Sequence, residues 1–230
     1  MIRLLLLVVM ALGACQATDK EQNMETSATS ELTYLALGDS YTIGEAVAEK
    51  DRWPVQLTKR LNEAGIEIAD PKIIATTGWT TDELKAGIEK EALTGTYDMV
   101  SLLIGVNNQY RGYSLEEYNA EFEELLNTAI SFAGGDKDKV FVVSIPDYGV
   151  TPYGQGNDPK KIGDGVDEFN IANKAITQRY GIQYFDITPV SKTALGVDEL
   201  NASDGLHPSG KMYTLWADII YPGVKSMLED

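Results

Sequence analysis

The only histidine of the chain, His207, lies three residues after Asp204 in an Asp-Gly-Leu-His-Pro stretch, and a Gly-Asp-Ser triplet ends at Ser40 far upstream. A serine hydroxyl is a weak nucleophile until an oriented imidazole removes its proton, so any histidine-assisted chemistry must use His207. A single tight turn would let the Asp204 carboxylate accept the Nδ1–H of the imidazole and leave Nε2 facing Ser40. These residues predict a catalytic triad.

A triad of this kind also needs hydrogen-bond donors where negative charge develops in the transition state. Gly78 lies in a Thr-Thr-Gly-Trp stretch, where the missing Cβ lets the backbone approach a substrate. Asn107 lies in a Gly-Val-Asn-Asn stretch and offers a side-chain NH2 group. Both are therefore candidate donors to an oxyanion.

Apolar, β-branched runs alternate with segments of helical period along the chain. Strands are predicted at 32–37, 66–75, 99–104, 140–145 and 182–187. Helices are predicted from residues 51–54, carrying Leu61, at 80–91, from Ser114, carrying Ile130, at 166–180, and from about Pro208 to close the chain. Thr80 with Glu83, and Ser114 with Glu117, have the spacing of capping boxes.

Strands that alternate with helices favour right-handed crossovers and a parallel sheet covered on both faces. We therefore expect a flavodoxin-like three-layer α/β/α sandwich with a five-stranded parallel sheet. Ligands bind beyond the carboxyl ends of the strands in such sheets. Since Ser40, Gly78, Asn107 and His207 each follow or adjoin the end of a predicted element, one rim of the sheet would collect them.

The chain resembles the SGNH (GDSL-type) serine hydrolase family, because four blocks of that family occur in order: the Gly-Asp-Ser triplet, Gly78, the Gly-Val-Asn-Asn stretch and the Asp-Gly-Leu-His-Pro stretch. The resemblance implies that Ser40 is the nucleophile, His207 the base and Asp204 the residue that orients it. It also implies that Gly78 and Asn107 join the Ser40 amide in an oxyanion hole.

Two positions depart from the family pattern. The third block usually ends in aspartate, and here it ends in Asn108. The first block often continues with leucine, and here Tyr41 follows the serine. The first departure affects local hydrogen bonding, and the second is expected to reshape the floor of the pocket.

The resemblance predicts an esterase that forms an acyl-enzyme, and we expect short-acyl or carbohydrate esters because no long apolar groove is evident in the loop sequences. A lysophospholipase or thioesterase of the same family and a non-catalytic glycan- or lipid-binding protein are the alternatives. The rim aromatic side chains line the pocket or simply pack the loops. Candidate substrate-binding residues are Asp39, Trp79, Asn108, Tyr110 and Tyr148, with Tyr153 nearby.

The N-terminus predicts export. Residues 1–14 carry Arg3, an apolar run and a Leu-Gly-Ala stretch directly before Cys15, which is typical of a signal peptide and resembles a bacterial lipobox. Cys15 would then carry lipid, residues 15–31 would form a flexible tether, and 32–230 would form the hydrolase domain. An ordinary cleaved signal with a chance cysteine is the alternative.

Charge and motifs exclude several partners. The formal net charge is −16, and −17 without the signal peptide (35 acidic against 18 basic side chains), so nucleic acid and anionic membrane surfaces would repel the protein. Membrane attachment would have to come from lipid on Cys15, in the outer membrane or periplasm. No dinucleotide or P-loop motif and no histidine-rich metal cluster occurs, so we expect no cofactor and no metal ion.

Overall fold

The computed structural model describes residues 31–229, so the predicted signal peptide, the predicted lipidated Cys15 and nearly all of the predicted tether lie outside the described residues. The described chain contains a five-stranded parallel sheet in the order β2-β1-β3-β4-β5. The strands are β1 (Tyr34–Gly38), β2 (Lys72–Ala75), β3 (Met99–Leu103), β4 (Val140–Val143) and β5 (Gln183–Phe185). This confirms the predicted sheet.

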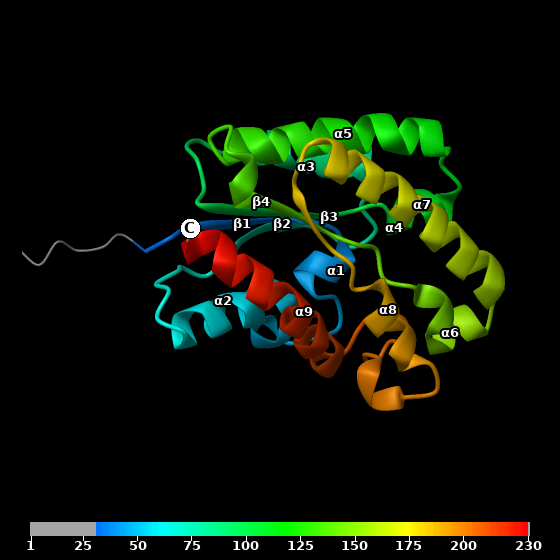
Figure 1. Ribbon diagram of the computed structural model, residues 1–230. Coiled ribbons are helices and arrows are strands. Elements are labelled where there is room, and N and C mark those ends of the chain that lie inside the picture. Colours follow the sequence, from blue (N-terminus) through cyan, green and yellow to red (C-terminus); the bar gives the residue numbers. More distant parts are fainter. Residues whose placement is uncertain (1–30, 230) are drawn as a thin grey trace, which may run out of the picture. The chain divides into compact units, whose positions relative to one another are not determined.

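Helices cover both faces of the sheet, which gives the predicted three layers (Figure 1). One layer contains α3 (Thr81–Glu91), α5 (Leu115–Phe132) and α7 (Pro159–Arg179). The opposite layer contains α2 (Trp53–Glu63) and α9 (Gly210–Glu229), which pack against each other. Because both faces are covered, every residue of β1, β3 and β4 is buried.

Short helices gather at the carboxyl ends of the strands, at the end of the sheet where Figure 1 labels α1, α4, α6 and α8. They are α1 (Ser40–Ile43), α4 (Val106–Arg111), α6 (Pro152–Gln155) and α8 (Thr188–Ser191). Single 3₁₀ turns occur at Glu49–Asp51, Lys137–Lys139, Tyr148–Val150, Lys192–Ala194 and Asp198–Leu200.

Two predicted starts were wrong by several residues. Strand β2 begins at Lys72, after Pro71, and of the residues before it only Ile68 pairs, through one isolated bridge with Leu32. Helix α7 begins at Pro159 rather than at 166, since the Asp158 carboxylate accepts a hydrogen bond from the Lys161 amide (3.1 Å) and caps it.

The last helix closes the described chain, as predicted, and continues to Glu229 through Pro222. Pro222 lies on the exposed side of α9, where water can satisfy the carbonyl group that the proline leaves unpaired. None of the helices in residues 31–229 is long and apolar enough to cross a membrane.

Candidate active site

Ser40 is placed by a tight connection between β1 and α1. An added Cβ on Gly38 would lie 2.1 Å from Thr42 Oγ1 and 2.6 Å from the Leu103 carbonyl oxygen, so only glycine lets α1 fold back this closely. Ser40 is the first residue of α1, where helix geometry gives its N–H no acceptor within the helix. Its hydroxyl makes no hydrogen bond with any described residue.

Asp39 supports this turn from beneath. Its side chain is buried, and Oδ1 accepts a hydrogen bond from the Tyr41 amide (3.0 Å), which caps α1. Burial raises the pKa of Asp39 to about 7, against the smaller lowering effect of the Tyr41 amide. Because the carboxyl group is enclosed, we assign Asp39 to the support of the turn that carries Ser40 rather than to substrate contact.

The Asp204 and His207 side chains meet as the sequence predicts. The distance from His207 Nδ1 to Asp204 Oδ2 is 2.6 Å, and Asp204 Oδ1 accepts hydrogen bonds from the amides of Leu206 (2.9 Å) and His207 (3.0 Å). Partial burial raises the pKa of Asp204, but the hydrogen bonds from the imidazole and the two amides outweigh it and lower that pKa. The carboxylate is therefore ionised and holds the imidazole by its Nδ1 side.

The imidazole lies beside α1. Its ring centroid is 5.6 Å from that of Tyr41, the residue after Ser40, and the two rings pack edge to face. No hydrogen bond within 3.5 Å joins Ser40 to His207 among the described residues. Catalytic hydrogen bonds are often long in free enzymes and tighten with substrate. Since Asp204 occupies Nδ1, Nε2 is the nitrogen left for a partner.

Gly78 and Asn107 lie next to each other on the same rim. Gly78 has a φ of +87°, in the left-handed region that favours glycine. Asn107 Nδ2 donates a hydrogen bond to the Trp79 carbonyl oxygen (2.9 Å) and has a second N–H to offer, since an amide NH2 carries two donors. The Gly78 carbonyl oxygen in turn accepts a hydrogen bond from Arg111 (2.6 Å).

Asn108, the departure from the family pattern, is fully buried and holds α3 in place. Its Oδ1 accepts from the Thr81 amide (3.1 Å), and its Nδ2 donates to Thr81 Oγ1 (2.6 Å). The Thr81 hydroxyl donates its own proton to Glu121, so a residue facing it must donate. Asparagine fits this requirement and an ionised aspartate does not, so we assign Asn108 to the fold rather than to substrate contact.

An aromatic pocket of about 200 Å³ opens beside Asn107. Its lining residues are Val106, Asn107, Tyr110, Tyr148, Tyr153 and Leu206. The Tyr110 and Tyr153 hydroxyls are 3.0 Å apart, and the Tyr148 hydroxyl donates to Gln109 Oε1 (2.9 Å). The candidate Trp79 is absent from this lining, because its ring packs over Gly87 of α3.

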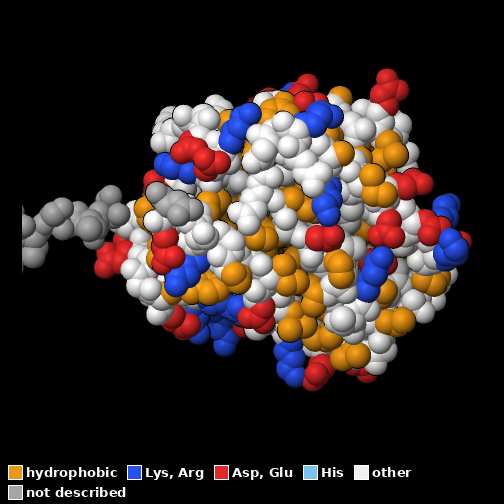
Figure 2. Space-filling model, in the orientation of Figure 1, with side chains coloured by type: hydrophobic (Ala, Val, Ile, Leu, Met, Phe, Trp, Pro, Cys, Tyr) orange, Lys and Arg blue, Asp and Glu red, His pale blue; other side chains and the backbone are white. Residues whose placement is uncertain are grey.

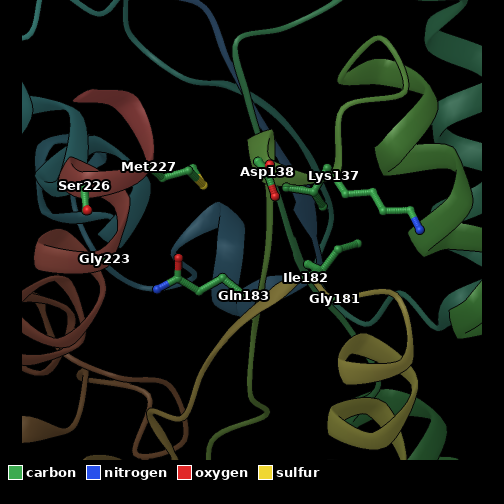
Figure 3. Close-up of a pocket in the computed structure, with 9 residues that line it drawn as sticks. Lys137, Asp138, Gly181, Ile182, Gln183, Gly223, Ser226 and Met227 are labelled. Carbon is green, nitrogen blue, oxygen red and sulfur yellow. The ribbon is translucent and has the colours of Figure 1, made fainter. Parts of the chain in front are cut away.

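A larger hollow of about 540 Å³ lies elsewhere (Figure 3). Its walls come from the amino ends of β4 and β5 and from the last turns of α9. This is the end of the sheet opposite to the carboxyl ends of the strands. Ser226 is on this wall, but the single histidine of the chain is at the other rim. This hollow therefore lacks the groups for histidine-assisted serine chemistry.

The surface charge is mixed despite the negative total. Figure 2 shows acidic and basic side chains interspersed on one face, with hydrophobic side chains gathered over its lower part. Fourteen ion pairs between Lys or Arg and Asp or Glu join described residues, most of them exposed, and exposed pairs contribute little stability. No group of three or more metal-ligating side chains occurs within residues 31–229.

The fold and the rim can now be compared with known proteins. The model of the GDSL-like Lipase/Acylhydrolase family matches residues 36–215, so the chain belongs to this family of carboxylic ester hydrolases. Comparison with curated proteins gives no match.

Solved structures share the fold. The crystal structure of TesA is 17% identical, with a TM-score of 0.67, and the match covers 85% of this chain and 99% of that one. The psychrotrophic esterase EstA from a Pseudoalteromonas species is 18% identical (TM-score 0.63, 87% and 100% covered). Axe2, an acetylxylan esterase from Geobacillus stearothermophilus, is 19% identical (TM-score 0.61, 87% and 95% covered).

Sequence reasoning missed Arg111, which contacts residues 76–79, the Gly78 loop. Arg111 follows Asn107 by four residues, so the two share one face of α4. A prediction of that short helix would have supplied the signal.

Proposed function

We propose that this protein is an exported, lipid-anchored serine esterase that hydrolyses carboxylic esters through an acyl-enzyme on Ser40. The observation that carries the proposal is the 2.6 Å hydrogen bond between His207 and Asp204, on the rim that also holds α1. It holds the one imidazole of the chain, which packs against Tyr41 of the segment that begins with Ser40. Membership of the GDSL-like family supports the same reaction class.

The proposed reaction begins when Ser40 Oγ attacks the ester carbonyl carbon and its proton passes to His207 Nε2. Asp204 stabilises the imidazolium that forms. The oxyanion accepts hydrogen bonds from the Ser40 amide, the Gly78 amide and the free N–H of Asn107. When the intermediate collapses, the C–O bond to the alcohol breaks and the imidazolium gives the alcohol its proton.

The second half of the reaction releases the acid. Water attacks the acyl-enzyme carbonyl while His207 takes a proton from it, and the same donors hold the second oxyanion. Collapse breaks the bond to Ser40 Oγ, which regains the proton from His207. Activity should therefore fall at acidic pH, because a protonated imidazole cannot accept the serine proton.

For the substrate, we propose a short-acyl or carbohydrate ester. The pocket beside Asn107 has a volume of about 200 Å³, below the range of about 300–1,000 Å³ that is usual for drug-sized ligands. Three of its six lining residues are tyrosines, and aromatic faces suit both small apolar groups and sugar rings. Such a pocket favours a small group over a long acyl chain.

The location is proposed from the sequence alone. The apolar run and the Leu-Gly-Ala-Cys order support export, cleavage before Cys15 and lipid attachment to its sulfur. A single acyl chain binds membranes only marginally, so several chains would be needed for a stable anchor. The protein would then lie in the outer membrane or periplasm.

Chain-length profiling tests the substrate proposal. Purified protein is assayed with p-nitrophenyl esters from C2 to C16 and with acetylated sugars. We expect kcat/KM to be highest at C2–C4 or on acetylated sugars and to fall about tenfold or more by C12, since the longer chain exceeds the pocket. An optimum at C12–C16 would favour the lysophospholipase or thioesterase alternative instead. The non-catalytic alternative predicts no turnover of any ester.

A further inference from the structure

We propose that Arg111 is a positioning residue for the oxyanion hole. It holds the peptide group between Gly78 and Trp79, and so the backbone that presents the Gly78 amide. The inference rests on the proposed function, because it assigns the Gly78 amide to the oxyanion. Arg111 is on the last turn of α4, and its Nη2 donates to the Gly78 carbonyl oxygen at 2.6 Å. It touches none of the residues of the predicted triad in any described hydrogen bond or ion pair.

The Gly78 loop needs such support because of its composition. A glycine explores a wide range of backbone angles, and Gly78 occupies the left-handed region at φ +87°. It follows the short strand β2, after a two-residue connection that belongs to no regular element. The Trp79 amide donates to the Thr76 carbonyl oxygen (3.2 Å) and closes a turn at Gly78, and outside contacts hold that turn in place.

Side chains from two segments hold three successive residues of this loop. Glu45, just after α1, accepts a hydrogen bond from the Thr77 hydroxyl. Arg111 holds the Gly78 carbonyl, and Asn107 holds the Trp79 carbonyl (2.9 Å). The two carbonyl bonds fix the peptide groups that follow the Gly78 amide, and the Glu45 bond fixes the residue before it.

Arg111 is itself fixed. Its Nη1 donates to Glu83 Oε1 (3.1 Å), and Glu83 Oε2 accepts from the Thr80 amide (3.0 Å) at the start of α3. Partial burial raises the pKa of Glu83, but the Thr80 amide and the guanidinium group outweigh it and lower that pKa, so the pair stays charged. A guanidinium group can engage two acceptors at once in a fixed geometry. Arg111 thereby ties the Gly78 loop to the first turn of α3.

The test compares Arg111→Ala and Arg111→Lys with the wild type and with Lys85→Ala. Lys85 pairs with Glu124 (2.6 Å) between α3 and α5, is similarly exposed, and does not touch the Gly78 loop. We expect Arg111→Ala to lower kcat for p-nitrophenyl acetate about 10- to 100-fold and to keep KM within about twofold of the wild type. A misplaced Gly78 amide would weaken stabilisation of the transition state more than binding of the substrate. The kcat of Arg111→Lys should lie between those of Arg111→Ala and the wild type, because an ammonium group cannot bind the Gly78 carbonyl and Glu83 together in the geometry of a guanidinium group.

Lys85→Ala should keep kcat within about twofold of the wild type, and thermal unfolding should shift alike in the two alanine variants. An unchanged kcat in Arg111→Ala, a raised KM with normal kcat, or an equal loss in Lys85→Ala would overturn the inference. If Arg111→Ala unfolds at the assay temperature, the test uses Arg111→Lys instead. An unchanged kcat in Arg111→Lys would then overturn the inference. An inactive wild type would instead refute the proposed function.

Discussion

Replacing Ser40 with alanine is expected to lower kcat for p-nitrophenyl acetate by about 10⁴- to 10⁶-fold, to the level that binding and oxyanion contacts alone support. The reason is that no acyl-enzyme can form without the Ser40 oxygen. Folding should change little, since the Ser40 hydroxyl has no hydrogen-bond partner among the described residues. Steady-state kinetics and thermal unfolding of the same preparation measure both effects.

Ser226→Ala is the matched control for this variant. Ser226 is an exposed serine at the hollow near the amino ends of β4 and β5, and its loss should leave kcat within about twofold of the wild type. Undiminished turnover in Ser40→Ala would show that another group performs the chemistry.

Replacing Asp204 with asparagine is expected to lower kcat about 10³- to 10⁴-fold. The asparagine NH2 group would favour the tautomer with its proton on Nε2, and that nitrogen could no longer accept the serine proton. The carbonyl oxygen can still accept from the amides of Leu206 and His207, so the turn should persist and KM should change little.

Asp198→Asn provides the comparison for this second effect. Asp198 is an exposed carboxylate in a neighbouring 3₁₀ turn, and its loss should leave kcat nearly unchanged. A loss below about tenfold in Asp204→Asn would mean that the imidazole does not depend on this carboxylate, and the proposed role of Asp204 would be wrong.

Periodicity was sufficient to predict the layers of the fold, because the long amphipathic helices and buried strands carry strong repeating patterns. It failed for α1, α4, α6 and α8, whose four to six residues are too few to show a period. The early start of α7 was nevertheless readable, since Asp158 and Pro159 form a cap and a first-turn proline.

The predictability of the site depended on how local its contacts are. Asp204 and His207 meet within one turn, so their spacing sufficed to predict the hydrogen bond. The role of Asn108 depends on Thr81, and that of Arg111 on Gly78, across separate elements. Such contacts arise only when the chain is folded, so sequence spacing could place Arg111 on the helix face of Asn107 but could not reveal Gly78 as its partner.

Covalent trapping of the serine shows whether His207, held by Asp204, activates Ser40. The wild type, Ser40→Ala and Asp204→Asn are treated with a fluorophosphonate probe, and the modified peptide is identified by mass spectrometry. We expect one adduct on Ser40 in the wild type, no adduct in Ser40→Ala and at least about tenfold slower labelling in Asp204→Asn. Ester hydrolysis by a wild-type protein that is not labelled on Ser40, or is labelled on another residue instead, would contradict this role of Ser40.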